Sequence, residues 1–144
     1  MSKPSRSIGT EDDRAERKER YHAVLRTVGL NTTEMQSPGA PETEIVVILA
    51  AHGRYSSDGV RTSLQAAVEN DDLLRWTGPE GYTRYTLVTA EDLKRLFYYA
   101  VDELKPPVSS LRSLVGSIAE ETDHSQEMLG EVNAAVRDYA REDA

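Results

Sequence analysis

The sequence contains no cysteine, which excludes disulfide bonds, thiolate zinc sites, iron–sulfur clusters and cysteine nucleophiles. It also lacks a long hydrophobic run, and its longest apolar stretch, residues 45–51, is too short to cross a bilayer. Residues 1–20 are polar and contain no apolar segment of the kind that signal peptides need. We therefore expect a cytoplasmic protein with no membrane attachment. At 144 residues, a domain can bury a core without a metal or a disulfide.

Lysine is scarce, with 4 lysines among 17 basic residues, and 25 acidic residues give a net charge of −8. This balance resembles that of proteins from halophilic archaea, in which dense carboxylates retain water and salt screens their mutual repulsion. An acidic mesophilic protein is the alternative. An acidic balance normally argues against nucleic-acid binding. That argument weakens in molar salt, where the Debye length is about 3 Å and counterion release drives little binding.

Known catalytic and metal-binding motifs are also missing. The sequence has no phosphate-binding loop, no G-x-S-x-G, no HExxH and no calcium loop. Its three histidines, His22, His52 and His124, lie far apart and show no metal-binding spacing. The acid pairs 71–72 and 120–121 are typical of solvated surface in so acidic a chain. We expect no enzymatic activity, no metal and no cofactor.

The N-terminal third divides into three parts. Residues 1–11 show no apolar periodicity and are predicted to be a disordered start. Residues 12–30 are predicted to form a helix, and 31–42 a polar linker that is long for a connection within a compact domain. The apolar stripe of the helix consists of Tyr21, Val24, Leu25 and Val28.

Two more helices are expected between residues 43 and 70. The segment 43–52 contains a β-branched run that would suit a strand, but its length and the following Gly53 favour a buried helix. Ser56 or Ser57 can cap the next helix, 57–70. One face of that helix is apolar and consists of Val60, Leu64, Ala67 and Val68.

The periodicity changes from helical to alternating at Leu73. Apolar and polar residues alternate on both sides of the turn 77–81, which predicts a β-hairpin over 73–88. Thr89 and Asp92 then form a capping box for a strongly amphipathic helix that ends before Pro106.

Beyond the prolines, two apolar seams share one heptad register. They predict either one long helix or two helices broken near Asp123, which could cap the second helix together with Gln126. An amphipathic helix must bury such a seam, either on its own chain or on a second copy. Because the spacing is the narrow one of paired helices, we expect a homodimer. The expected dimer interface is Val108, Leu111, Val115, Ile118, Leu129, Val132, Val136 and Tyr139.

The order helix, helix, turn, helix, hairpin, helix resembles the winged helix-turn-helix superfamily. The resemblance is carried by EIVVILAAHGRYSSDGVRTSLQAAVENDDLLRWTGPEGYTRYTLVT, residues 44–89, and this segment also looks like small winged-helix proteins of halophilic archaea. It implies a mainly α fold with a two-stranded hairpin. A winged-helix domain would span 12–105, and a C-terminal helical extension that carries dimer contacts would span 106–144. The linker 31–42 departs from the pattern, because winged helices have a short connection there.

The resemblance further implies that helix 57–70 is a recognition helix and that 77–83 is a wing. Base edges in the major groove would then be contacted from the outward side of the helix. The expected contacts to double-stranded DNA are Ser57, Arg61, Thr62, Gln65, Tyr82 and Arg84. The overall plan is similar to PadR-like regulators, and we expect a small transcriptional regulator.

Charge supports a different interpretation. Residues 43–104 hold six basic and ten acidic residues, which is not the basic patch that DNA-binding domains show. The main alternative is a winged-helix module that binds a protein partner. A ligand sensor or an enzyme with a pocket between the winged helix and the tail is the other alternative.

Overall fold

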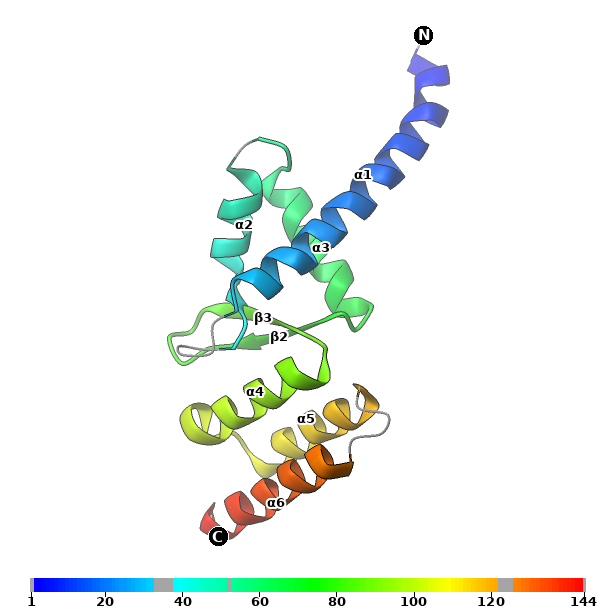
Figure 1. Ribbon diagram of the computed structural model, residues 1–144. Helices are drawn as coiled ribbons and strands as arrows, with labels where there is room; N and C mark the ends of the chain where they lie inside the picture. Colours follow the sequence, from blue (N-terminus) through cyan, green and yellow to red (C-terminus); the bar gives the residue numbers. More distant parts are fainter. Residues whose placement is uncertain (1, 33–37, 52, 122–125, 144) are drawn as a thin grey trace.

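The computed structural model describes residues 2–32, 38–51, 53–121 and 126–143, and it is mainly helical with one small antiparallel sheet (Figure 1). The sheet and three helices form an N-terminal half, and the last three helices stack beneath the sheet. In chain order the elements are α1 (Ser2–Leu30), β1 (Ala40–Pro41), α2 (Glu42–Ala50), α3 (Ser57–Glu69), β2 (Leu73–Thr77), β3 (Thr83–Leu87), α4 (Ala90–Tyr99), a π-helical turn (Ala100–Leu104), α5 (Val108–Glu121) and α6 (Gln126–Asp143).

The sheet has three strands in the order β1-β3-β2, which is one strand more than the two-stranded hairpin that we expected. The hairpin itself is confirmed, with Leu73 opposite Leu87 and Thr77 opposite Thr83. The added strand β1 lies in the expected linker and pairs Ala40 with Tyr85. Two residues that include a proline give no alternating pattern, which is why the sequence did not indicate this strand.

Gly39 makes the approach of β1 to β3 possible. Its φ is +99°, a conformation that L side chains rarely adopt. A Cβ at this position would lie 2.7 Å from the carbonyl oxygen of Tyr85 and 2.6 Å from Thr86 Oγ1. The backbone therefore comes close to β3 only because residue 39 has no side chain.

The first hydrophobic core lies between α1, α2, α3 and the sheet. Its fully buried side chains include Val24, Ile45, Leu64 and Tyr85. Helix α1 begins at Ser2, so residues 2–11 are helical where we expected disorder. The helical prediction for 43–52 is confirmed over Glu42–Ala50, but Val47 and Ile48 are exposed, so this helix is buried on one side only.

A second core joins α4, α5 and α6. Leu93 and Phe97 of α4 belong to the same buried cluster as both apolar seams, and Tyr139 of α6 donates a hydrogen bond to the Pro106 carbonyl at 2.5 Å. Six of the eight residues expected at the dimer interface are buried within one chain, and Val108 and Leu129 are partly buried there. Within the single chain, the seams of α5 and α6 therefore pack against each other and against α4, which is the first of the two expected alternatives, and the homodimer stays a prediction.

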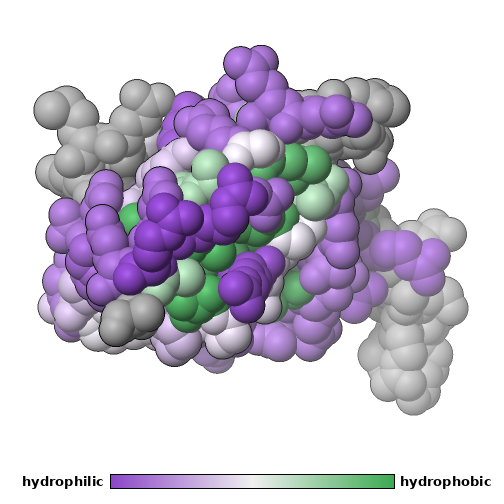
Figure 2. Space-filling view, turned by 90° about the horizontal axis from the view of Figure 1, so that it is seen from below, coloured by the Kyte–Doolittle hydropathy of each residue, from purple (hydrophilic) through white to green (hydrophobic). Residues whose placement is uncertain are grey.

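The C-terminal extension consists of two helices, α5 and α6, which selects one of the two expected alternatives. Asp123, the expected cap, lies outside the described residues. Thr89 is confirmed as the N-cap of α4, because its Oγ1 accepts a hydrogen bond from the Asp92 amide at 3.2 Å. The reciprocal bond of a capping box is not formed, since the Thr89 amide donates to the Leu87 carbonyl and Asp92 instead accepts from the Thr89 hydroxyl at 2.6 Å. From below, the face of the C-terminal helices shows a strip of hydrophobic residues bordered by hydrophilic ones (Figure 2).

Polar contacts fasten α4 to α6 at the edge of the second core. Glu131 of α6 accepts a hydrogen bond from Tyr98 at 2.9 Å and pairs with Lys94 at 3.1 Å. Burial and the hydrogen bond to Glu131 raise the pKa of Tyr98 to about 12. The hydrogen bonds from Lys94 and Tyr98 lower the pKa of Glu131, so this carboxylate stays ionised at neutral pH.

The described segments contain no helix that is both long and apolar enough to span a membrane. The longest helix, α1, is polar over most of its length.

The second core predicts a large cost for removing one of its central side chains. Replacing the fully buried Ile118 by Ala should lower the free energy of unfolding by about 2–5 kcal/mol, through lost burial and a residual cavity. Ile48→Ala is the matched control, since Ile48 is 40% exposed and should cost clearly less. Chemical denaturation in the same buffer measures both. Equal losses would contradict a packed C-terminal bundle.

Candidate nucleic-acid interface

Helix α3 is held by a cap at its N-terminus and by one buried face. Ser56 Oγ accepts a hydrogen bond from the Gly59 amide at 3.0 Å, so Ser56 is the cap and Ser57 is the first helical residue. Val60 and Leu64 are fully buried against α1 and α2. This packing fixes which side of α3 faces outward.

Four of the six residues predicted to contact DNA lie on that outward side. Ser57, Arg61, Thr62 and Gln65 are all exposed on α3. Two carboxylates, Asp58 and Glu69, share the same surface and line a shallow hollow with Arg61, Thr62 and Gln65. The polar residues expected on α3 therefore do lie on one face. The same face also carries carboxylates, which argue against DNA binding.

The polar side chains of this face are engaged with one another. Arg61 lies 4.0 Å from Asp58, and Gln65 donates a hydrogen bond to Glu69 at 3.0 Å. The Thr62 hydroxyl donates to the Asp58 carbonyl at 2.9 Å. Each exposed pair of this kind is worth only about 0–1 kcal/mol, so each can be exchanged for another partner.

Tyr82 is exposed at the hairpin turn, whereas the side chain of Arg84 is largely buried. Tyr82 is 60% exposed at the tip, beside Gly81, whose φ of +88° permits the tight turn. The side chain of Arg84 is only 13% exposed, lies against Gly78 and pairs with Glu80 at 3.5 Å. Its buried Nε has no hydrogen-bond partner among the described residues. Arg84 is therefore part of the hairpin packing, and we remove it from the predicted interface.

Arg75 of β2, which is not among the predicted contacts, lies beside α3. Its Nη2 donates a hydrogen bond to Gln65 Oε1 at 2.5 Å, and its Nε donates to the Tyr85 hydroxyl at 3.3 Å. The guanidinium also lies 5.6 Å from the centre of the Tyr85 ring. The sequence carried a signal for this residue: it alternates with Leu74 and Trp76, which puts it on the opposite face of β2 from them.

Tyr85 links this arrangement to α2. Its hydroxyl donates to Glu42 Oε1 at 2.7 Å, and burial followed by this hydrogen bond raises its pKa. The phenol therefore stays protonated at neutral pH. Hydrogen bonds run in sequence from Glu42 through Tyr85 and Arg75 to Gln65, so α2, the sheet and α3 are connected by polar contacts.

Charge along α3 is unequal at its two ends. Arg20 of α1 lies over the N-terminal turn and donates a hydrogen bond to Ser63 at 2.7 Å. Arg54, which pairs with Glu19, precedes the same end of α3. The helix dipole adds partial positive charge there. At the other end, Glu69 and Asp72 are exposed, and Asp72 accepts a hydrogen bond from Tyr21.

The other sequence candidates that lie within the described segments do not form a site. His22 is exposed and contacts the edge of the Tyr21 ring, whereas His52 and His124 lie outside the described residues. Within the segments that the structure describes, no group of histidine or acidic side chains is arranged to hold a metal ion. Arg14, Arg17 and Lys18 are exposed on α1.

Comparisons with known protein families, with curated protein sequences and with solved structures found no match for this chain. The interpretation of the α3 face therefore depends on its own geometry and charge.

The capping geometry of α3 separates two adjacent serines. Replacing Ser56 by Ala should lower the free energy of unfolding by about 1 kcal/mol, because the Gly59 amide loses its acceptor. Ser57→Ala should change the stability by less than about 0.5 kcal/mol, since Ser57 is exposed inside the helix. Thermal or urea unfolding of the two variants gives the comparison. The reverse order would move the cap to Ser57.

Proposed function

We propose that this chain is a winged-helix protein that binds double-stranded DNA through α3, as a small cytoplasmic transcriptional regulator. The element order and the sheet order β1-β3-β2 support the winged-helix assignment, with α3 as the recognition helix and the β2–β3 turn as the wing. The third strand strengthens this assignment, because it closes the sheet beside the hairpin and shortens the effective linker.

The observation that carries the proposal is the composition of one helix face. Arg61, Thr62 and Gln65 lie on the same exposed side of α3, with Ser57 at its start. Arginine pairs with guanine and glutamine with adenine in the major groove through two hydrogen bonds each. A recognition helix presents its N-terminal part to the bases, and here that part is the more positive end.

Binding requires the internal contacts of this face to open. Arg61 leaves Asp58, and Gln65 leaves Arg75 and Glu69 to reach a base edge. Arg75 is then free to contact a phosphate. Since these pairs are exposed and weak, the bidentate base contacts outweigh them, at about 1–3 kcal/mol for each good pair.

The acidity of the chain sets the conditions for binding. Asp58, Glu69 and Asp72 repel phosphate at low salt, and this repulsion is screened in brine. Affinity then rests on hydrogen bonds and on DNA shape, with a small electrostatic contribution. A homodimer on a two-fold DNA site stays part of the proposal, but its interface must use surface outside the buried seams of α5 and α6.

A second candidate function has its own observation. Val47 of α2 and Tyr82 of the wing are 66% and 60% exposed, and they line a shallow hollow with Pro41 and Glu44. Exposed apolar side chains rimmed by polar ones are typical of protein contacts. This surface favours a protein partner for the α2–wing side, and it does not involve the outward face of α3.

Substitution of Arg61 tests the DNA proposal. A DNA site is first selected from a genomic library in molar salt. On this site, Arg61→Ala should weaken specific binding by about 1–3 kcal/mol and relax the base preference at one position. Arg137→Ala, which removes the same charge from an exposed position of α6, should leave binding unchanged. Fluorescence anisotropy gives both affinities.

Two results would contradict this assignment. Equal effects of Arg61→Ala and Arg137→Ala would exclude α3 as the reading element. Failure to select any site from the library would remove the DNA function and leave the α2–wing surface as the functional one.

A further inference from the structure

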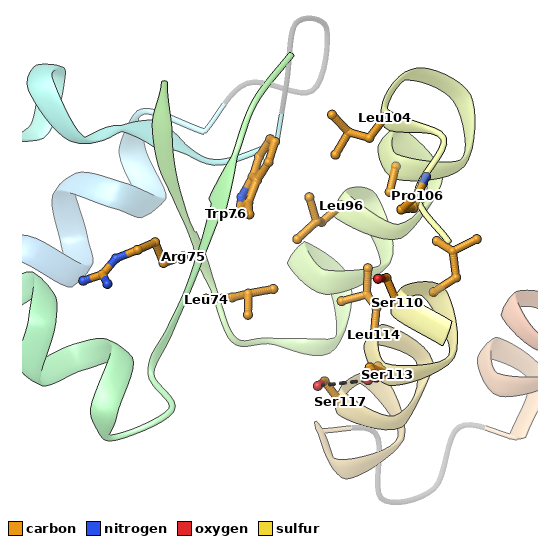
Figure 3. Close-up of a pocket in the computed structure, with 12 residues that line it drawn as sticks. Leu74, Arg75, Trp76, Leu96, Leu104, Pro106, Ser110, Ser113, Leu114 and Ser117 are labelled. Atoms are coloured by element: carbon orange, nitrogen blue, oxygen red, sulfur yellow. Dashed lines mark hydrogen bonds between the residues drawn. The ribbon is translucent and has the colours of Figure 1, made fainter. Parts of the chain in front are cut away.

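A cleft separates the sheet from the C-terminal helices (Figure 3). Its volume is about 290 Å³, near the lower end of the range for small-molecule pockets. Leu74 and Trp76 of β2 form one wall, and Leu96 of α4 and Leu114 of α5 face them. The cleft thus lies between the two hydrophobic cores and is bordered by apolar side chains from both halves of the chain.

We propose that this cleft binds a neutral, largely apolar small molecule. Among the described residues that line it, the only one with a charged side chain is Arg75, and that side chain points away from the cleft toward α3 (Figure 3). A charged ligand would leave its charge without a partner on these walls, which is costly.

Serine hydroxyl groups line the α5 side of the cleft, whereas the indole N–H of Trp76 on the opposite wall already donates to Thr86 Oγ1 at 2.8 Å. Ser110, Ser113 and Ser117 follow one another along α5 at helical spacing and border the cleft. Ser117 donates a hydrogen bond to the Ser113 carbonyl at 3.3 Å. Hydroxyl groups can donate or accept, so this edge suits a ligand with one or two uncharged polar atoms, such as a hydroxyl or a carbonyl. Few polar groups on a mainly apolar wall are typical of sites that orient a small ligand.

The backbone beside the cleft gives a second, independent observation. Ala100 and Leu104 line the cleft from a π-helical turn, and Lys105 follows it with a φ of +50°. The Lys105 amide donates to the Ala100 carbonyl at 2.8 Å. π-helical turns occur frequently at functional sites, and a left-handed non-glycine residue carries strain that functional sites often retain. Both features lie at the wall of this cleft.

A ligand bound in the cleft would contact both the sheet and the C-terminal helices and so hold them together. The strand β2 contributes Leu74 and Trp76 to the cleft, while its Arg75 contacts α3 on the other side. An occupant would therefore hold the strand that supports the α3 face. Ligand binding in the cleft does not depend on DNA binding, because Arg75, the one residue common to the cleft and the α3 face, points its side chain away from the cleft.

The single tryptophan of the chain makes the cleft directly observable. Trp76 lies in its wall, so its fluorescence reports occupancy. The probe is N-phenyl-1-naphthylamine, a neutral lipophilic fluorophore, titrated into the full chain at near-native salt. We expect saturable binding of one probe per chain, with energy transfer from Trp76. The anionic relative 1-anilinonaphthalene-8-sulfonate should bind at least about tenfold more weakly, because the cleft offers its charge no partner.

Two serines on the same helix supply the matched variants. Ser113→Phe places a ring in the cleft and should weaken probe binding about tenfold or more by occupying its space. Ser109→Phe, an exposed position of α5 outside the cleft, should bind the probe as the original chain does. Ser110→Phe is a second filling variant, and circular dichroism checks that all three keep their helices.

Each outcome decides the proposal. Loss of binding in both filling variants, with binding retained in Ser109→Phe, supports it. Absence of saturable binding by the original chain, or equal affinities in all variants, would overturn the site. Equal affinities for the neutral and the anionic probe would overturn the ligand class.

Discussion

Burial of Tyr85 on the central strand is the interaction on which the rest of the structure depends. Its ring lies in the first core, its backbone faces β1 on one side and β2 on the other, and its hydroxyl donates to Glu42. Arg75, which donates to that hydroxyl, also holds Gln65 of α3. One residue thus joins the core, the sheet and the outward face of α3, and a buried hydroxyl needs such partners.

Local patterns in the sequence predicted the helices and the hairpin well, because each element is determined by a few neighbouring residues. The alternation around Trp76, the cap at Thr89 and the glycine at the end of α2 required no knowledge of distant contacts. Strand β1 was missed for the opposite reason. Its two residues become a strand only because Gly39 lets the backbone approach Tyr85, and that contact lies far along the chain.

In the candidate site, too, the sequence predicted what neighbouring residues determine and missed what distant contacts determine. Helical spacing was enough to put Arg61, Thr62 and Gln65 on one face, but it could not show that Arg84 folds back onto Gly78 or that Arg75 reaches Gln65. The seams of α5 and α6 illustrate a further limit. A heptad pattern says that Ile118 and Val132 must be buried, and it does not say whether α4 or a second chain covers them.

We propose that the outward face of α3 contacts DNA. Backbone amide chemical shifts, recorded at near-native salt as a selected duplex is added, test it most directly because they report on both candidate surfaces at once. We expect the largest shifts at Arg61 and Gln65, smaller ones at the wing tip around Tyr82 and none along α6. Shifts confined to the exposed side of α2 around Val47, or the absence of shifts with any duplex, would contradict it.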